Sequence, residues 1–198
     1  MAIQTDKTVI YHISKCGGTW VGEAVRRVGL PYERCKEDKE KLKKLDNEFG
    51  LRRKHGVPAF TKGVEGLFSV CFIRHPLSWY KSIWDYKKNP VSRGRYPPDI
   101  YWVPDYDDFV TGLLDAYPGG FVTKLYQYYT DVDFVGRLEH LADDLVTALT
   151  LAGETFDEEA LRASGPRNVS KKSTAVLSTE TYNRALEAES WVLERFYG

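Results

Sequence analysis

A glycine-rich segment near the start of the chain carries residue types that bind phosphate or sulfate. The segment SKCGGTW (14–20) follows the β-branched and aromatic run 8–13 and leads into a helical pattern at 19–28. At such a junction, backbone N–H groups and the helix dipole converge on an anion. Gly17 and Gly18 would let the backbone approach closely, and Lys15 supplies a mobile positive charge. The spacing predicts an anion-binding loop, with an ordinary strand-to-helix turn as the alternative.

A second candidate anion site follows the apolar run FSVCFI (68–73). Arg74 and Pro76 end this predicted strand, and Ser82 lies one to two turns into the helix predicted at 78–86. An arginine fork and a hydroxyl can share one phosphate group. The sequence therefore predicts two strand-to-helix units, each ending in an anion-binding group.

The first segment differs from the loops that bind ATP and GTP. In the pattern GxxxxGK[ST], the lysine follows the glycines and precedes a hydroxyl that binds Mg²⁺. In this chain Lys15 precedes Gly17 and Gly18. The residue order therefore argues against a magnesium–nucleotide site.

Both segments resemble the cofactor motifs of sulfotransferases that use 3′-phosphoadenosine 5′-phosphosulfate (PAPS). The first motif of that family is P-K-S/T-G-T/G-T, often followed by Trp, and the second is R-N-P-x-D-x-x-x-S. The residues that match the two motifs in register are Lys15, Gly17, Gly18, Thr19, Trp20, Arg74, Pro76 and Ser82. The departures are Ser14, Cys16, His75 and Ser78. Two matches in the correct order and context make the resemblance specific.

The resemblance implies a role for each matched position. Lys15 and the backbone of residues 16–19, which include Cys16 and Thr19, would hold the 5′-phosphosulfate. Trp20 would pack near the adenine, with plain core packing as the alternative. Arg74 and Ser82 would hold the 3′-phosphate.

The general base is predicted between the two motifs, where the family has a Lys-x-His segment. His55 matches that base and Arg53 matches the second lysine, near the sulfuryl oxygens. Histidine is suited to this role because its pKa lies close to neutral pH. His12 is a rival, although a histidine at a strand end is more often a hydrogen-bonded structural residue. Some branches of the family use glutamate, which leaves three further candidates: Glu23, Glu65 and Glu139.

Two segments late in the chain also resemble the family. Residues 133–145 are similar to a segment of carbohydrate and bacterial sulfotransferases that runs from a strand through G-R/Y-x-E-x-L into a helix. This similarity implies support for the site, with simple packing as the alternative. Arg167 and Lys171 lie in a basic loop where the family has its last cofactor contact. They are predicted on the 3′-phosphate side, with a solvated basic turn as the alternative.

The pattern of elements predicts one α/β domain over residues 1–198, with a P-loop-like fold. Strand-like and helical segments alternate, which favours a mostly parallel sheet covered by helices on both faces. Helices are predicted at 33–49 and at 179–196, the latter capped by Ser178. Residues 89–106, with four of the nine prolines and several aromatics, are predicted as an irregular excursion. It would act as an acceptor lid, with a small core formed by its own aromatics as the alternative.

Composition limits the class of protein. Lys plus Arg and Asp plus Glu both number 28, so bulk charge predicts no binding to nucleic acid or to anionic membranes. No apolar run reaches the roughly 20 residues that span a bilayer, and the start of the chain lacks the features of an export signal. Three cysteines without metal-ligand spacing suit a reducing compartment, so we expect a cytoplasmic protein without a metal.

These observations predict an enzyme that transfers a sulfuryl group from PAPS to a hydroxyl or amine of a small-molecule or carbohydrate acceptor. The alternatives are a small P-loop kinase that uses ATP and a nucleotide-binding module without catalysis. The sequence leaves the identity of the acceptor and the oligomeric state open.

Overall fold

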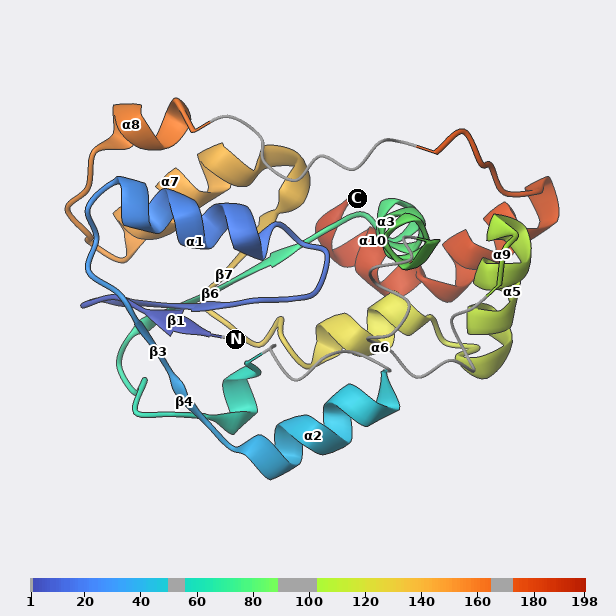
Figure 1. Cartoon of the computed structure of the whole chain (residues 1–198), viewed down its shortest axis with the longest axis horizontal. Helices are drawn as coiled ribbons and strands as arrows, with labels where there is room; N and C mark the ends of the chain where they lie inside the picture. The colour runs from blue at the N-terminus through green and yellow to red at the C-terminus, as the bar shows by residue number, and fades with distance from the viewer. Residues whose placement is uncertain (1, 50–55, 89–102, 165–172) are drawn as a thin grey trace.

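The computed structural model describes residues 2–49, 56–88, 103–164 and 173–198 (Figure 1). Its main sheet has five strands in the order β3-β1-β2-β6-β7. The strands of this sheet are β1 (Ile3–Gln4), β2 (Thr8–Tyr11), β3 (Glu33–Arg34), β6 (Phe68–Ile73) and β7 (Phe134–Arg137). A separate two-stranded sheet pairs β4 (Lys36–Glu37) with β5 (Thr61–Lys62).

The main sheet is mixed, whereas the sequence predicted a mostly parallel one. β2, β6 and β7 are parallel neighbours, but β1 pairs antiparallel with both β2 and β3. The chain turns back tightly between β1 and β2, and Thr5 stabilises that turn because its hydroxyl bonds the backbone of Thr8. Such a short hairpin can form only an antiparallel pair. The α/β class is confirmed and the arrangement of the strands is corrected.

Helices cover both faces of the sheet. Side chains alternate along the central strands, so that Ile10, Val70 and Phe72 pack on one face and Tyr11 and Ile73 on the other. The first face is covered by α1 (Gly18–Arg27), α7 (Leu141–Leu151) and α8 (Glu158–Arg162), which lie together in Figure 1. The opposite core is formed by α2 (Lys39–Glu48), α3 (Pro76–Lys88), α5 (Tyr106–Ala116), α6 (Phe121–Gln127), α9 (Thr179–Ala188) and α10 (Ser190–Phe196). Short 3₁₀ turns lie at Pro58–Phe60 and Leu138–His140.

Two predicted helices differ from the observed ones. The segment 33–49 contributes β3 and β4 before α2 begins, because the Asp38 side chain accepts the backbone N–H groups of Glu40 and Lys41 and so caps the helix there. The terminal helix starts after the predicted cap, Ser178, but divides into α9 and α10 at Glu189. The Glu189 side chain is fully buried and binds α6, which accounts for the break.

The parallel strands fix where the two sequence motifs meet. β2 lies between β1 and β6, and its last residue, Tyr11, is level with Cys71 of β6. Ile73, the last residue of β6, is level with Arg137 of β7. The segments after β2, β6 and β7 therefore emerge at one edge of the sheet, which is where α/β proteins bind ligands.

Among the described residues, no helix is both long enough and apolar enough to cross a bilayer. Of the predicted excursion 89–106, residues 89–102 lie outside the described residues, and Tyr106 begins α5.

Candidate anion-binding site

The first loop has the backbone that an anion cradle requires. Lys15 has φ 66°, the only positive φ of a non-glycine residue in the described part of the chain, and Gly17 has φ 83°. A lysine in this left-handed region costs about 1–2 kcal/mol, a type of strain that is concentrated at functional sites. α1 begins at Gly18 directly after the turn. The first N–H groups of α1 therefore lie at the loop, as the sequence predicted.

Gly18 is needed for a close approach to the preceding strand. A Cβ at Gly18 would lie 2.0 Å from Cδ2 of His12, so the imidazole occupies the space that a side chain would need. The ring of His12 therefore packs beneath the first turn of α1. A Cβ at Gly22, in the same helix, would meet nothing within 4 Å.

Gly18→Ala is expected to lower the free energy of unfolding by about 1–3 kcal/mol, because the new methyl group must displace the His12 ring or the helix. Gly22→Ala is the matched control, and it should raise stability by about 0.5–1 kcal/mol, because alanine favours a helix over glycine. Urea denaturation followed by circular dichroism measures both values. Equal stability of the two variants would show that the His12 contact is not tight.

The Lys15 side chain is half-buried beside α3. Its Nζ lies 4.2 Å from the centroid of the Tyr86 ring, within the range of a cation–π contact. Burial lowers the pKa of Lys15, and the nearby positive charge of Arg74 lowers it further. Neither Lys15 nor Arg74 forms an ion pair within the described residues. Two cations therefore lie close together at one sheet edge, with the Asp85 carboxylate as an opposite charge near Lys15. A bound anion would stabilise the two cations further.

Arg74 follows β6 and has an unused donor. Its Nε is buried and has no hydrogen-bond partner in the described part of the protein. Buried donors of this kind are rare, because an unsatisfied one costs about 1–3 kcal/mol and more when it is charged. An oxyanion bound at this edge would satisfy it.

One residue that the sequence did not single out joins the two loops. The hydroxyl of Tyr126, a fully buried residue of α6, bonds the backbone N–H and the carbonyl oxygen of Arg74 at 3.0 and 2.9 Å. The same hydroxyl lies 3.3 Å from Sγ of Cys16 in the first loop. No local signal in the sequence distinguishes Tyr126, because an aromatic residue in an apolar helix usually only packs.

The other matched residues take varied positions. Ser82 is half-buried on α3, and Thr19 is exposed in the first turn of α1. Trp20 is buried in the core between the sheet, α7 and α8, and its Nε1 donates a hydrogen bond of 3.2 Å to the carbonyl oxygen of Ser164. The contacts of Trp20 with a nucleotide stay a prediction. Four predicted site residues lie outside the described residues: Arg53, His55, Arg167 and Lys171.

The rival bases differ in position. Glu65 lies in the turn before β6, and Arg74 follows the other end of this strand. Since β6 is about 20 Å long, the Glu65 carboxylate is far from Arg74. Glu139 follows β7 and accepts hydrogen bonds from the His75 backbone N–H at 3.0 Å and the Tyr197 hydroxyl at 3.1 Å. These bonds give Glu139 a supporting role beside the second loop. Glu23 lies half-buried within α1.

His12 is largely buried, and burial lowers its pKa to about 4. The folded protein therefore keeps this imidazole neutral at a pH where the unfolded chain, with a pKa near 6.5, binds a proton. We expect His12 to lower the free energy of unfolding by about 3 kcal/mol as the pH drops from about 6.5 to 4. Urea denaturation at several pH values, with His12→Gln as the comparison, measures the difference. A parallel pH dependence of the two proteins would contradict this assignment.

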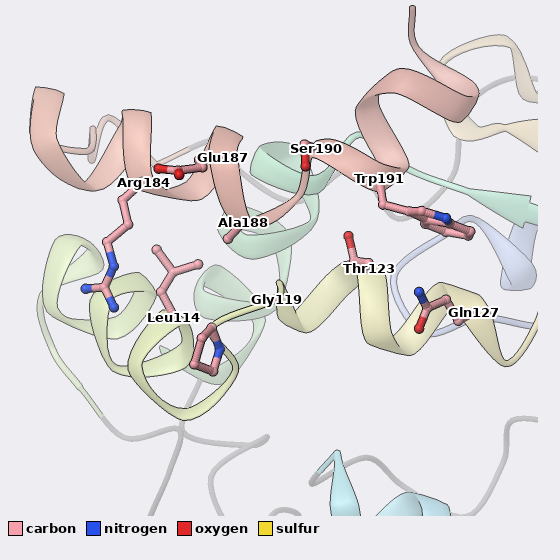
Figure 2. Close-up of a pocket in the computed structure, with 10 residues that line it drawn as sticks. Leu114, Gly119, Thr123, Gln127, Arg184, Glu187, Ala188, Ser190 and Trp191 are labelled. Carbon is pink, nitrogen blue, oxygen red and sulfur yellow. The ribbon is translucent and has the colours of Figure 1, made fainter.

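A groove of about 630 Å³ lies elsewhere, between α5, α6 and the C-terminal helices (Figure 2). Leu114, Thr123, Arg184 and Trp191 are among the residues that line it, and none of the matched motif residues does. Two of its polar side chains already have partners within the protein, since Thr123 bonds Glu189 and Arg184 pairs with Asp115. The groove is therefore separate from the candidate site.

Comparisons of this chain with protein-family models, with curated proteins and with solved structures each find no match.

Proposed function

We propose that this protein is a PAPS-dependent sulfotransferase with a P-loop-like fold. The observation that supports the proposal most is the buried Nε of Arg74, which has no hydrogen-bond partner in the described part of the chain and lies near Lys15. The two segments that resemble the cofactor motifs follow β2 and β6, which are neighbouring parallel strands. A ligand with two anionic groups suits such a pair of cations.

The residues present fit PAPS better than ATP with magnesium. PAPS has a 5′-phosphosulfate for the loop 14–20 and a 3′-phosphate for Arg74 and Ser82. The lysine precedes the glycines, and no magnesium-binding hydroxyl follows it as it does in ATP-binding loops. We therefore favour the sulfotransferase over the kinase.

When bound, PAPS supplies a sulfuryl group that is attached to a phosphate leaving group. His55 would take the proton of the acceptor hydroxyl or amine as the acceptor forms its bond to sulfur. Lys15, with Arg53, would offset the negative charge that develops as the bond between sulfur and the leaving phosphate breaks. Arg74 and Ser82 would hold the 3′-phosphate, so that the reacting groups stay in line. The proposed acceptor is a small molecule or a carbohydrate.

The experiment that tests this function follows the release of the product 3′-phosphoadenosine 5′-phosphate (PAP) from PAPS, with phenols, amines and oligosaccharides as acceptors. We expect release that depends on an acceptor and that continues in the presence of EDTA. ATP consumption that requires Mg²⁺ would favour the kinase instead. Binding of PAP without turnover on any acceptor would favour the non-catalytic module.

We also propose a cytoplasmic location. Cys16, Cys35 and Cys71 are free thiols in the structure, and the cytoplasm keeps thiols reduced. Fractionation of the cells that produce the protein would test this, and recovery outside the cytoplasm would contradict it.

A further inference from the structure

The contacts of Tyr126 use the whole hydrogen-bonding capacity of its hydroxyl. A tyrosine hydroxyl has one hydrogen to donate and can accept two hydrogen bonds. Because the hydrogen goes to the carbonyl oxygen of Arg74, the Arg74 backbone N–H and the Cys16 thiol are left as the two donors. Burial raises the pKa of the Cys16 thiol to about 12, so the sulfur keeps its hydrogen at neutral pH. The longer contact of Sγ with the Ser14 carbonyl oxygen, at 3.5 Å, is the weaker competitor for that hydrogen.

These bonds hold the backbone of the second loop and the Cys16 side chain of the first loop. Two of them lie on either side of Arg74, at the point where β6 ends, so they fix the direction in which the guanidinium side chain leaves the backbone. The third bond holds Cys16, which stands between Lys15 and Gly17 in the first loop. Because both loops bond the same hydroxyl, a shift of either loop away from the other must weaken one of the bonds with Tyr126.

The position of Tyr126 is itself fixed from the other end of α6. The buried carboxylate of Glu189 accepts the backbone N–H groups of Val122 and Thr123 at 3.0 and 2.7 Å, and the Thr123 hydroxyl at 2.7 Å. Tyr126 lies about one turn further along this helix. Its hydroxyl is thus a rigid point between the two loops.

We propose that Tyr126 is a positioning residue that couples the two anion-binding loops into one cofactor site. This inference rests on the proposed function, since it assigns one loop to the 5′ end and the other to the 3′ end of the same nucleotide. With the hydroxyl in place, Arg74 is aligned for the 3′-phosphate whenever the first loop holds the 5′ end. Without it, the 3′-phosphate contributes less to binding.

The test compares Tyr126→Phe with the wild-type protein by calorimetric titration of PAP and 5′-AMP, which differ by the 3′-phosphate. We expect the preference for PAP over 5′-AMP to fall about tenfold in the variant, in line with the loss of ordinary hydrogen bonds. Tyr128→Phe is the matched control. The Tyr128 ring packs on Phe49, and its hydroxyl makes no hydrogen bond within the described residues, so this variant should keep the wild-type preference.

Hydrogen exchange gives a second measurement that does not depend on the nucleotide. In Tyr126→Phe, the Arg74 amide loses its acceptor, and the Cys16 amide, which bonds the Ile13 carbonyl oxygen, lies in the loop that is released. We expect both amides to exchange about tenfold faster than in the wild type. A faster Arg74 amide with an unchanged Cys16 amide would overturn the coupling.

The outcomes separate the inference from the proposed function. A wild-type preference for PAP that Tyr126→Phe leaves intact would overturn the role of Tyr126 and leave the sulfotransferase proposal standing. A wild-type protein that does not prefer PAP would overturn the function, and the exchange rates would then decide the coupling alone. If Tyr126→Phe fails to fold, Cys16→Ala leaves the two bonds to Arg74 intact and removes the contact of Tyr126 with the first loop, together with the weaker contact of Sγ with the Ser14 carbonyl oxygen. It too should reduce the preference for PAP, by about threefold. An unchanged preference in that variant would overturn the inference.

Discussion

Lys15→Ala is expected to lower the rate of the proposed sulfuryl transfer about 1000-fold, because the variant loses the positive charge to which we assign stabilisation of the transition state in the loop 14–20. The loss should appear in the rate of the bound complex more than in the affinity for PAP, since the backbone N–H groups of the loop are unchanged. Turnover of PAPS at saturating acceptor, combined with titration of PAP, measures both quantities.

Stability should not fall in Lys15→Ala. Alanine meets the same backbone strain at φ 66° as lysine does, and the removal of a half-buried charge near Arg74 offsets the loss of the cation–π contact with Tyr86. We therefore expect a free energy of unfolding equal to or above that of the wild type. Lys44→Ala, an exposed lysine of α2, is the control and should keep both activity and stability. Full transfer activity in Lys15→Ala would overturn the role assigned to this residue.

Glu189→Ala is expected to lower the free energy of unfolding by about 3–5 kcal/mol, because it leaves several buried donors without an acceptor. The donors are the Tyr80 hydroxyl, the backbone N–H groups of Val122 and Thr123, and the Thr123 hydroxyl. Urea denaturation measures the loss.

Two further variants test whether the loss of stability comes from the missing acceptor oxygens. Glu189→Gln keeps the shape and one acceptor oxygen, so it should lose less stability than Glu189→Ala. Glu194→Ala removes an exposed carboxylate from α10 and should change stability by less than about 0.5 kcal/mol. A small effect of Glu189→Ala would mean that these donors find water or other partners.

The sequence predicted the parts of the fold that have local signals. The β-branched and aromatic runs of β2 and β6 mark strands, and the glycines and the proline that follow them mark the starts of α1 and α3. The two-residue strands β1 and β3 are too short to show a pattern, and they make the sheet mixed. The break at Glu189 was also not predictable, because glutamate favours a helix and its buried partners lie far away in the sequence.

Some residues of the candidate site could likewise be predicted from the sequence, and others could not. The sequence singled out Lys15 and Arg74 by the motifs around them, and the parallel pairing of β2 with β6 brings them to one edge. Tyr126 was missed because its role depends on contacts with residues more than 50 positions away. The same holds for the hydrogen bonds of Glu139, whose donors, the His75 backbone N–H and the Tyr197 hydroxyl, lie 64 and 58 positions away.

Calorimetric titration of the wild-type protein with PAP, 5′-AMP and ATP, in EDTA and without added metal, tests whether this protein has a site for PAPS. We expect PAP to bind with a dissociation constant in the micromolar range or below, and 5′-AMP and ATP to bind at least about 100-fold more weakly. Only PAP has the 3′-phosphate that we assign to Arg74, whose buried Nε has no hydrogen-bond partner among the described residues. Equal binding of PAP and 5′-AMP, a preference for ATP, or no binding of any nucleotide would contradict the proposed site.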